Sequence, residues 1–185
     1  MTPFDGYVDR SPPTQKVLED VFKAEDRFFN SGDRLVLRDD RWLAFADRVG
    51  DTFRWKGENV STNEVAEILN VAAGVLETNI YGVEVPGSEG RAGMASIHCD
   101  DTFSIEDFAR FVLENLASYQ RSLFVRLQKE IQITVTFKHR KVDYRRDGYN
   151  PGKVSDPQFV LENGDYIRLD APAYSRILDG SQTFR

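Results

Sequence analysis

The sequence is poor in the residues that build metal centres and covalent cross-links. Its 185 residues include one cysteine and two histidines. A single thiol, Cys99, cannot form an internal disulfide, and with only His98 and His139 beside it the sequence offers no metal cluster. These absences exclude a disulfide-stabilised scaffold and fit a reducing compartment that faces the cytosol.

Long hydrophobic runs and an excess of positive charge are also missing. No stretch approaches the roughly 20 apolar residues that cross a bilayer, and Met1 to Arg10 lacks the pattern of a signal peptide. We therefore expect membrane attachment to be peripheral or to depend on residues outside this sequence. The 24 basic and 30 acidic residues give a net charge of -6, so we expect no nucleic-acid partner.

What is present is enough for a folded domain. The sequence is 41% hydrophobic and 29% charged, which suits one globular domain or a small domain with a piece of another. Residues 1–49 predict a linker, a short helix over 16–22 and a β-hairpin with strands at 34–38 and 42–46. Because two strands cannot bury a face alone, this hairpin predicts the trailing edge of a larger sheet.

Residues 50–142 predict a separate, small α+β domain. A capping box at Ser61 to Glu64 opens a helix that should reach about Ala73, and Ser104 begins a second helix. Three strands are expected, at 80–85, 93–99 and 123–127. The order of these elements predicts a three-stranded sheet with helices packed on one face.

Glycine and proline mark both boundaries of this domain. Val49-Gly50-Asp51 separates it from the hairpin, and the glycine there tolerates the backbone rotation that a hinge needs. Beyond 142 the helical and strand patterns are broken by turn residues, among them Gly148 and Pro151. Residues 143–185 therefore predict a loop-rich carboxy-terminal extension with a short helix near 173–178.

The most specific segment is Phe45 to Ser61, Phe-Ala-Asp-Arg-Val-Gly-Asp-Thr-Phe-Arg-Trp-Lys-Gly-Glu-Asn-Val-Ser. By pattern alone it favours a solvated hairpin. Together with Tyr-Gly-Val-Glu-Val-Pro-Gly at 81–87 and Glu-Gly-Arg-Ala-Gly-Met-Ala at 89–95, it resembles the fatty acid transport proteins, also called very-long-chain acyl-CoA synthetases, of the adenylate-forming superfamily. The resemblance runs from Phe4 to Leu169.

The resemblance implies the carboxy-terminal portion of an ATP-dependent ligase that joins long or very long fatty acids to coenzyme A, a reaction linked to fatty acid uptake. The carboxylate first attacks the α-phosphate of ATP to give acyl-adenylate and pyrophosphate. A small lid domain then rotates, and the coenzyme A thiol attacks the intermediate. ATP with Mg2+ and coenzyme A are thus expected as substrates of the full-length enzyme, with none bound tightly by this chain.

The resemblance implies that two residues on the amino-terminal side of the hinge contact the nucleotide. Asp33, in Ser31-Gly32-Asp33, matches the aspartate that grips the ribose hydroxyls, and a carboxylate can accept hydrogen bonds from both. Arg48 matches the arginine whose fixed fork of donors suits ribose and phosphate oxygens. Without the resemblance, Asp33 would be a turn carboxylate and Arg48 a surface ion-pair partner.

The same resemblance implies a pivot and a loop that faces the thioester step. Gly50 occupies the pivot position, with Asp51 beside it, although a plain turn glycine is the alternative. The loop that turns toward the intermediate is Trp55, Lys56, Gly57, Glu58 and Asn59.

A basic run near the end of the lid domain is implied to supply the catalytic cation. In Thr136-Phe137-Lys138-His139-Arg140-Lys141-Val142, the Lys-Val pair aligns Lys141 with the lysine that stabilises charge at the α-phosphate, and Lys138 is the fallback. A solvated basic run is the alternative. Val135 and Ser122 stand where relatives carry glycine and proline, which could displace this loop.

Other parts of such an enzyme are not in this sequence. The phosphate loop, adenine pocket and acyl tunnel belong to an amino-terminal AMP-binding domain, so we expect this chain alone to be inactive and to be part of a longer protein. Family resemblance implies the cytosolic face of the endoplasmic reticulum or plasma membrane. It also leaves a ligase for bile acids or other bulky carboxylates open, because acyl selectivity lies in the missing domain.

A non-enzymatic function is the main alternative. The chain could be a lid-like interaction module that docks on a full-length paralogue or another partner. The isolated hairpin at 34–46 motivates this alternative, since an unpaired sheet edge is a template for another strand.

Overall fold

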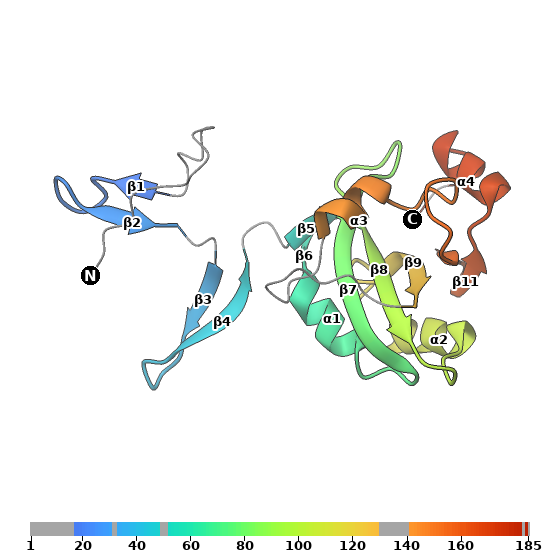
Figure 1. Ribbon diagram of the computed structural model, residues 1–185, viewed down its shortest axis with the longest axis horizontal. Coiled ribbons are helices and arrows are strands. Elements are labelled where there is room, and N and C mark those ends of the chain that lie inside the picture. The colour runs from blue at the N-terminus through green and yellow to red at the C-terminus, as the bar shows by residue number, and fades with distance from the viewer. Residues whose placement is uncertain (1–16, 31–32, 49–51, 130–140, 183, 185) are drawn as a thin grey trace. The chain divides into compact units, whose positions relative to one another are not determined.

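The computed structural model describes residues 17–30, 33–48, 52–129, 141–182 and 184 (Figure 1). The chain divides into two compact units, residues 1–49 and 50–185. The first unit contains only paired strands among its described residues. These strands are β1 (Val17–Glu19), β2 (Arg27–Phe29), β3 (Asp33–Leu37) and β4 (Leu43–Arg48).

The strands of the first unit form two separate antiparallel pairs, β1 with β2 and β3 with β4. The β3–β4 pair is the predicted hairpin. The helix predicted over 16–22 was wrong, because Val17 to Glu19 pair as a strand. The local reason is Asp26, whose carboxylate accepts hydrogen bonds from the backbone N–H groups of Val21 and Phe22 at 2.7 and 3.0 Å. Those bonds favour a turn over a helix.

The first unit exposes large apolar side chains. Phe22 is 83% exposed, Trp42 74% and Leu37 66%. Two-stranded sheets provide no second layer against which such side chains can pack. The first unit therefore lacks a hydrophobic core of its own among the residues that the structure describes.

The second unit is an α+β fold around a five-stranded sheet, which confirms the predicted fold class (Figure 1). The strand order is β11-β10-β9-β8-β7, with β8 and β9 parallel and the other neighbours antiparallel. A small hairpin, β5–β6, stands beside it. The elements are β5 (Thr52–Trp55), β6 (Glu58–Ser61), α1 (Thr62–Leu69), β7 (Val75–Val83), β8 (Ala92–Cys99), α2 (Ile105–Asn115), β9 (Ser122–Gln128), α3 (Lys141–Asp147), β10 (Gln158–Glu162), β11 (Asp165–Arg168) and α4 (Ala171–Leu178).

The three predicted strands correspond to β7, β8 and β9, and the sheet continues beyond them. Residues 143–185, which predicted a loop-rich extension, contribute β10 and β11 at one edge of the sheet. A signal for this hairpin was available, because Asn163 and Gly164, both with positive φ, join β10 to β11 as the Asn-Gly pair that is typical of a type I′ turn.

Helices cover both faces of the sheet, because α3, a helix that the sequence analysis did not predict, lies on the face opposite α2. Tyr81 lies in one cross-strand row that ends at Ile167 of β11, and the ring of Tyr144 from α3 stacks on Tyr81 at 5.7 Å. Tyr166, next to Ile167, points to the opposite face, where Phe108 of α2 packs on its ring at 5.8 Å.

Local capping places the helices as the sequence indicates. The Ser61 hydroxyl accepts a hydrogen bond from the Glu64 N–H at 3.3 Å, and Ser104 does the same for Asp107 at 3.2 Å. The helix from Ser61 ends at Leu69, before the expected Ala73. Among the described residues, no helix combines the length and apolar character that crossing a membrane requires.

Candidate functional site

The predicted thioester-face loop is the tip of the β5–β6 hairpin. Trp55 pairs with Glu58, and the two residues between them have positive φ, 51° at Lys56 and 84° at Gly57. Two left-handed residues in a two-residue loop are typical of a type I′ turn, whose twist matches that of the strands. The structure thus brings the five predicted residues, 55–59, together at one tip.

The two sides of this tip differ in burial. The Trp55 side chain is buried, with 4% exposure, and belongs to the core of the second unit. Lys56, Gly57, Glu58 and Asn59 are exposed. Trp55 therefore anchors the hairpin, while the four exposed residues are available for contact with a ligand or another domain.

A close backbone contact fastens the hairpin to the loop before β8. The Arg91 N–H donates to the Arg54 carbonyl oxygen at 2.7 Å, and Gly90 bridges to Trp55. Gly90 has φ +87°, and a Cβ placed on it would lie 2.2 Å from that same oxygen. Only glycine fits such an approach, so the sequence Glu-Gly-Arg at 89–91 holds the hairpin in place.

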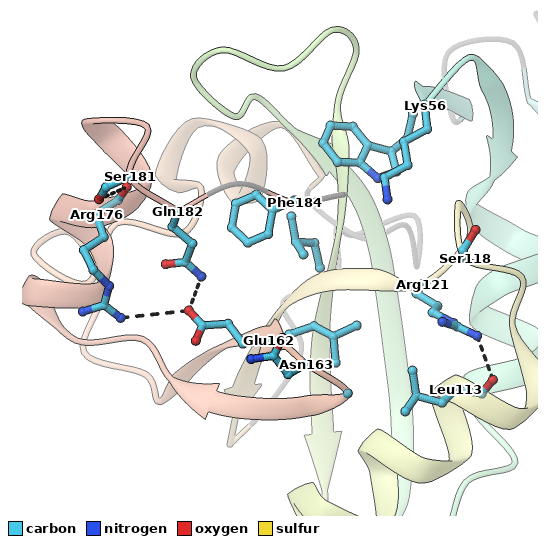
Figure 2. Close-up of a pocket in the computed structure, with 14 residues that line it drawn as sticks. Lys56, Leu113, Ser118, Arg121, Glu162, Asn163, Arg176, Ser181, Gln182 and Phe184 are labelled. Atoms are coloured by element: carbon cyan, nitrogen blue, oxygen red, sulfur yellow. Dashed lines mark hydrogen bonds and ion pairs between the residues drawn. The ribbon is translucent and has the colours of Figure 1, made fainter.

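A cavity of about 710 Å³ lies beside the hairpin tip (Figure 2). Its wall combines Trp55 and Lys56 with side chains from the start of β9, the β10–β11 turn and the carboxy-terminal tail. Figure 2 shows Phe184 of the tail between Gln182 and Lys56. The cavity therefore depends on the carboxy-terminal extension, which the sequence did not indicate as part of a site.

Most charged groups of this cavity already have protein partners. The Arg121 guanidinium donates to the carbonyl oxygens of Leu116 and Leu113 at 3.0 and 2.9 Å, at the end of α2. Glu162 accepts a hydrogen bond from Gln182 and lies 4.0 Å from the Arg176 guanidinium. These contacts shape the cavity wall.

The predicted nucleotide contacts are brought together at the level of the backbone. Asp33 and Arg48 are directly opposite partners in the β3–β4 ladder. Their side chains lie outside what the structure describes, and so do the pivot residues Gly50 and Asp51. The nucleotide-binding and hinge assignments therefore remain predictions.

The catalytic lysine stays a prediction as well. Lys141 is the first residue of α3, and its backbone is helical. Its side chain is not described, and Lys138 lies outside the described residues.

A buried arginine in β9 is a feature that the sequence reasoning missed. Arg126, whose side chain is 9% exposed, forms an ion pair with Asp156 at 2.6 Å and lies 4.0 Å from Asp147 at the end of α3. Its guanidinium carbon is 5.4 Å from the centre of the Tyr144 ring. One signal was available, because Arg126 interrupts the apolar run of residues 123–127. We call Arg126, Tyr144, Asp147 and Asp156 the Arg126 cluster.

Groups with shifted pKa values do not form an acid–base pair in the described parts of the chain. Burial raises the pKa of Tyr149 to about 12 and raises the pKa of Tyr81 and Tyr166 still further. Burial, with Asp100 and Asp101, also raises the pKa of the Cys99 thiol, which makes it a poor nucleophile. Within the described ranges, no group of three His, Cys, Asp or Glu side chains is placed to hold a metal ion.

Comparison with curated proteins gives close relatives over almost the whole chain. It is 45% identical over 184 residues to the long-chain fatty acid transport protein 2 of Rattus norvegicus. The match covers 97% of this chain and 30% of that protein. It is 45% identical over 185 residues to the long-chain fatty acid transport protein 3 of Homo sapiens, covering 97% and 27%. The chain thus spans less than a third of the length of these relatives. Searched against models of protein families, it matches none.

Solved structures of adenylate-forming enzymes share the fold. A fatty acyl CoA synthetase of Mycobacterium tuberculosis has a TM-score of 0.55 and 25% identity over 64% of this chain and 24% of its own. ATP-bound MatB of Rhodopseudomonas palustris has a TM-score of 0.61 over 74% of this chain and 27% of its own. At 18% identity, the second similarity shows the fold alone.

Proposed function

Because this chain belongs to the family of long-chain fatty acid transport proteins, we propose that it is the lid-bearing carboxy-terminal part of an ATP-dependent long-chain or very-long-chain fatty acid:CoA ligase. The observation that carries the proposal is the 45% identity over 97% of the chain. The chain covers 27–30% of the two relatives described above. We therefore assign the phosphate loop, adenine pocket and acyl tunnel to an amino-terminal AMP-binding domain outside this sequence.

The first unit supports a larger parent domain. Its hairpins expose Phe22, Leu37 and Trp42, and two-stranded sheets cannot cover such side chains. Burying a large apolar side chain stabilises a protein by about 1.5–3 kcal/mol. In this proposal residues 1–49 complete the AMP-binding domain, residues 50–142 are the lid, and residues 143–185 extend it.

In the first half-reaction the fatty acid carboxylate attacks the α-phosphate of ATP, which enters with Mg2+. Negative charge develops on the phosphate oxygens as pyrophosphate leaves. Lys141 supplies a cation to this charge, while Asp33 and Arg48 hold the ribose and neighbouring oxygens. A fixed ammonium contributes most where water is excluded, so the lid must be closed over the nucleotide at this step.

In the second half-reaction the lid turns about Gly50 and Asp51. The lysine is withdrawn, and the hairpin tip at 55–59 moves toward the acyl-adenylate, which the coenzyme A thiol attacks. The tip suits this role because four of its residues are exposed while Trp55 is anchored in the core. The contact of Arg91 with Arg54 makes the tip move with the sheet as one body.

The proposed function can be tested by supplying the missing amino-terminal domain. Fusing the chain to the amino-terminal part of the long-chain fatty acid transport protein 3 should give fatty-acid-dependent exchange of pyrophosphate into ATP and formation of acyl-CoA. Lys141→Ala should lower exchange by about 100-fold, the effect of removing one group that stabilises transition-state charge. Lys153→Ala, an exposed lysine of the extension, is the matched control.

The outcomes separate the assignments. Loss of exchange with Lys138→Ala and not with Lys141→Ala would move the catalytic role to Lys138. An active fusion in which neither substitution matters would refute the lid assignment. The chain without the added domain should form no acyl-adenylate, because it lacks the phosphate loop.

The alternative is a non-catalytic lid that docks on a full-length paralogue. The exposed apolar side chains of the first unit favour it, since another chain could cover them. Size-exclusion chromatography of the chain mixed with a full-length relative distinguishes the two: a stable complex and an inactive fusion would support docking. A fusion that ligates bile acids and not fatty acids would point instead to the bulky-carboxylate ligase.

We place the longer protein on the cytosolic face of the endoplasmic reticulum or plasma membrane, with membrane contact that is peripheral or made by residues outside this chain. The support is the similarity to the long-chain fatty acid transport proteins. Fractionation of cells that express the longer protein tests this placement.

A further inference from the structure

The Arg126 cluster joins segments on both sides of the predicted catalytic lysine. Arg126 is in β9, the last described strand before α3. Its Nε atom donates to Oδ2 of Asp156 at 2.7 Å, and its Nη2 atom forms an ion pair with the same oxygen at 2.6 Å. Asp156 comes after α3 in the chain and two residues before the start of the strand β10. One buried side chain thus connects the strand before the lysine segment to the loop after it.

The same guanidinium also contacts α3 itself. Its Nη1 atom lies 4.0 Å from Oδ2 of Asp147, the last residue of the helix. Its plane lies near the ring of Tyr144, which in turn stacks on Tyr81 of the sheet. Because α3 begins at Lys141 and ends at Asp147, a contact that fixes one end of this short helix also limits where the other end can lie.

Buried polar residues form a row across one face of the sheet at Arg126. Arg126 pairs across the sheet with Ser96 and Gln158, and Ser96 pairs with Asn79, so a row of four buried polar residues crosses strands β7 to β10. In the described structure the side-chain amides of Asn79 and Gln158 have no hydrogen-bond partner, and neither does Nη1 of Arg126. Well-packed apolar residues would stabilise such a position at least as well as a buried ion pair. A role in geometry is the better explanation for the charge.

We propose that Arg126 is a positioning residue for the lysine-bearing segment. Its guanidinium holds the end of α3 and the loop at Asp156 against β9, and this sets the position of Lys141 at the start of α3. The inference rests on the proposed function for its catalytic consequence. The physical tie between Arg126 and α3 does not depend on that function and can be tested in the chain itself.

The first experiment measures amide hydrogen exchange in the 185-residue chain. The double variant Arg126→Met with Asp156→Asn removes the ion pair without leaving a buried carboxylate unpaired. We expect the amides of α3 to exchange at least tenfold faster, while those of α1 and α2 keep their protection. Arg110→Gln is the control, because Arg110 forms an exposed ion pair with Asp107 on α2.

Two results would refute the claim that Arg126 holds α3 in position. Unchanged exchange in α3 would show that Arg126 does not hold the helix. An equal loss of protection in α1, α2 and α3 would show that the ion pair only supports the fold. If the double variant does not fold, Asp147→Asn, which removes only the longer 4.0 Å contact, gives the same comparison, with a smaller increase expected in α3.

The second experiment separates the half-reactions in the fusion enzyme. Arg126→Lys retains the charge but loses the fork of donors that spans Asp147 and Asp156. We expect pyrophosphate exchange to fall at least tenfold with an unchanged KM for ATP, and thioester formation from supplied acyl-adenylate to change less than twofold. Equal losses in both half-reactions would refute a positioning role. A wild-type fusion without pyrophosphate-exchange activity would refute the proposed function instead. The hydrogen-exchange result for α3 would stand.

Discussion

Replacing Gly90 by alanine tests whether the hairpin at 52–61 is held by backbone contact with the loop before β8. An alanine Cβ at this position would lie 2.2 Å from the Arg54 carbonyl oxygen, whereas real Cβ contacts essentially never fall below 3.0 Å. One of the two backbones has to move by nearly an ångström. The movement should break the hydrogen bond from the Arg91 N–H to that oxygen.

The expected loss of stability combines two effects. Gly90 has φ +87°, and a left-handed conformation costs an alanine about 1–2 kcal/mol. The broken backbone hydrogen bond adds about 1 kcal/mol. Displacement of the hairpin, whose Phe53 and Trp55 side chains are buried in the core, brings the expected total to about 2–4 kcal/mol. This is a large part of the roughly 5–15 kcal/mol that stabilises a typical domain.

The assay is urea unfolding of the chain, followed by tryptophan fluorescence because Trp55 lies beside the broken contact. Gly87→Ala is the matched control in the same loop. Gly87 also has positive φ, +72°, but an added Cβ would meet nothing within 4 Å. We expect Gly87→Ala to cost about 1–2 kcal/mol, from the conformation alone. The difference between the two variants therefore measures the close approach.

Equal losses for the two variants would refute the reasoning, because the contact with Arg54 would then contribute nothing. A second readout connects the contact to function. In the fusion enzyme, Gly90→Ala should weaken thioester formation more than adenylation, since the hairpin carries the tip at 55–59.

Two further predictions concern stability. Burial raises the pKa of the Tyr149 phenol from 10.0 to about 12, so the folded chain keeps this proton at a pH where the unfolded chain loses it. Stability should therefore be intact below pH 10.0 and fall as the pH rises from there to about 12. The fall should be less steep in Tyr149→Phe, as urea unfolding across this range would show. Identical slopes for the two proteins would contradict the assignment. Ser104→Ala should cost about 1 kcal/mol by removing the cap of α2, whereas Ser118→Ala, an exposed serine, should leave the urea midpoint unchanged.

The candidate site was predictable where its residues are neighbours in the sequence. The hairpin tip is an example, because Lys56-Gly57 between two short strands is a local turn signal. The helix caps at Ser61 and Ser104 are others. The Arg126 cluster was not predictable in this way, because Arg126 and Asp156 are thirty residues apart and no local pattern pairs them.

The sequence by itself determined the family, the α+β class, the starts of α1 and α2 and the residues of the hairpin tip. Each follows from short-range chemistry: a hydroxyl that caps its own helix, alternation along one strand, or a motif that is continuous in the chain. Only the tertiary structure decided that β10 joins β9, that α3 lies on the face opposite α2, and that a buried arginine ties α3 to the sheet. These are pairings between distant segments, whose energies depend on burial and geometry that exist only after the chain has folded.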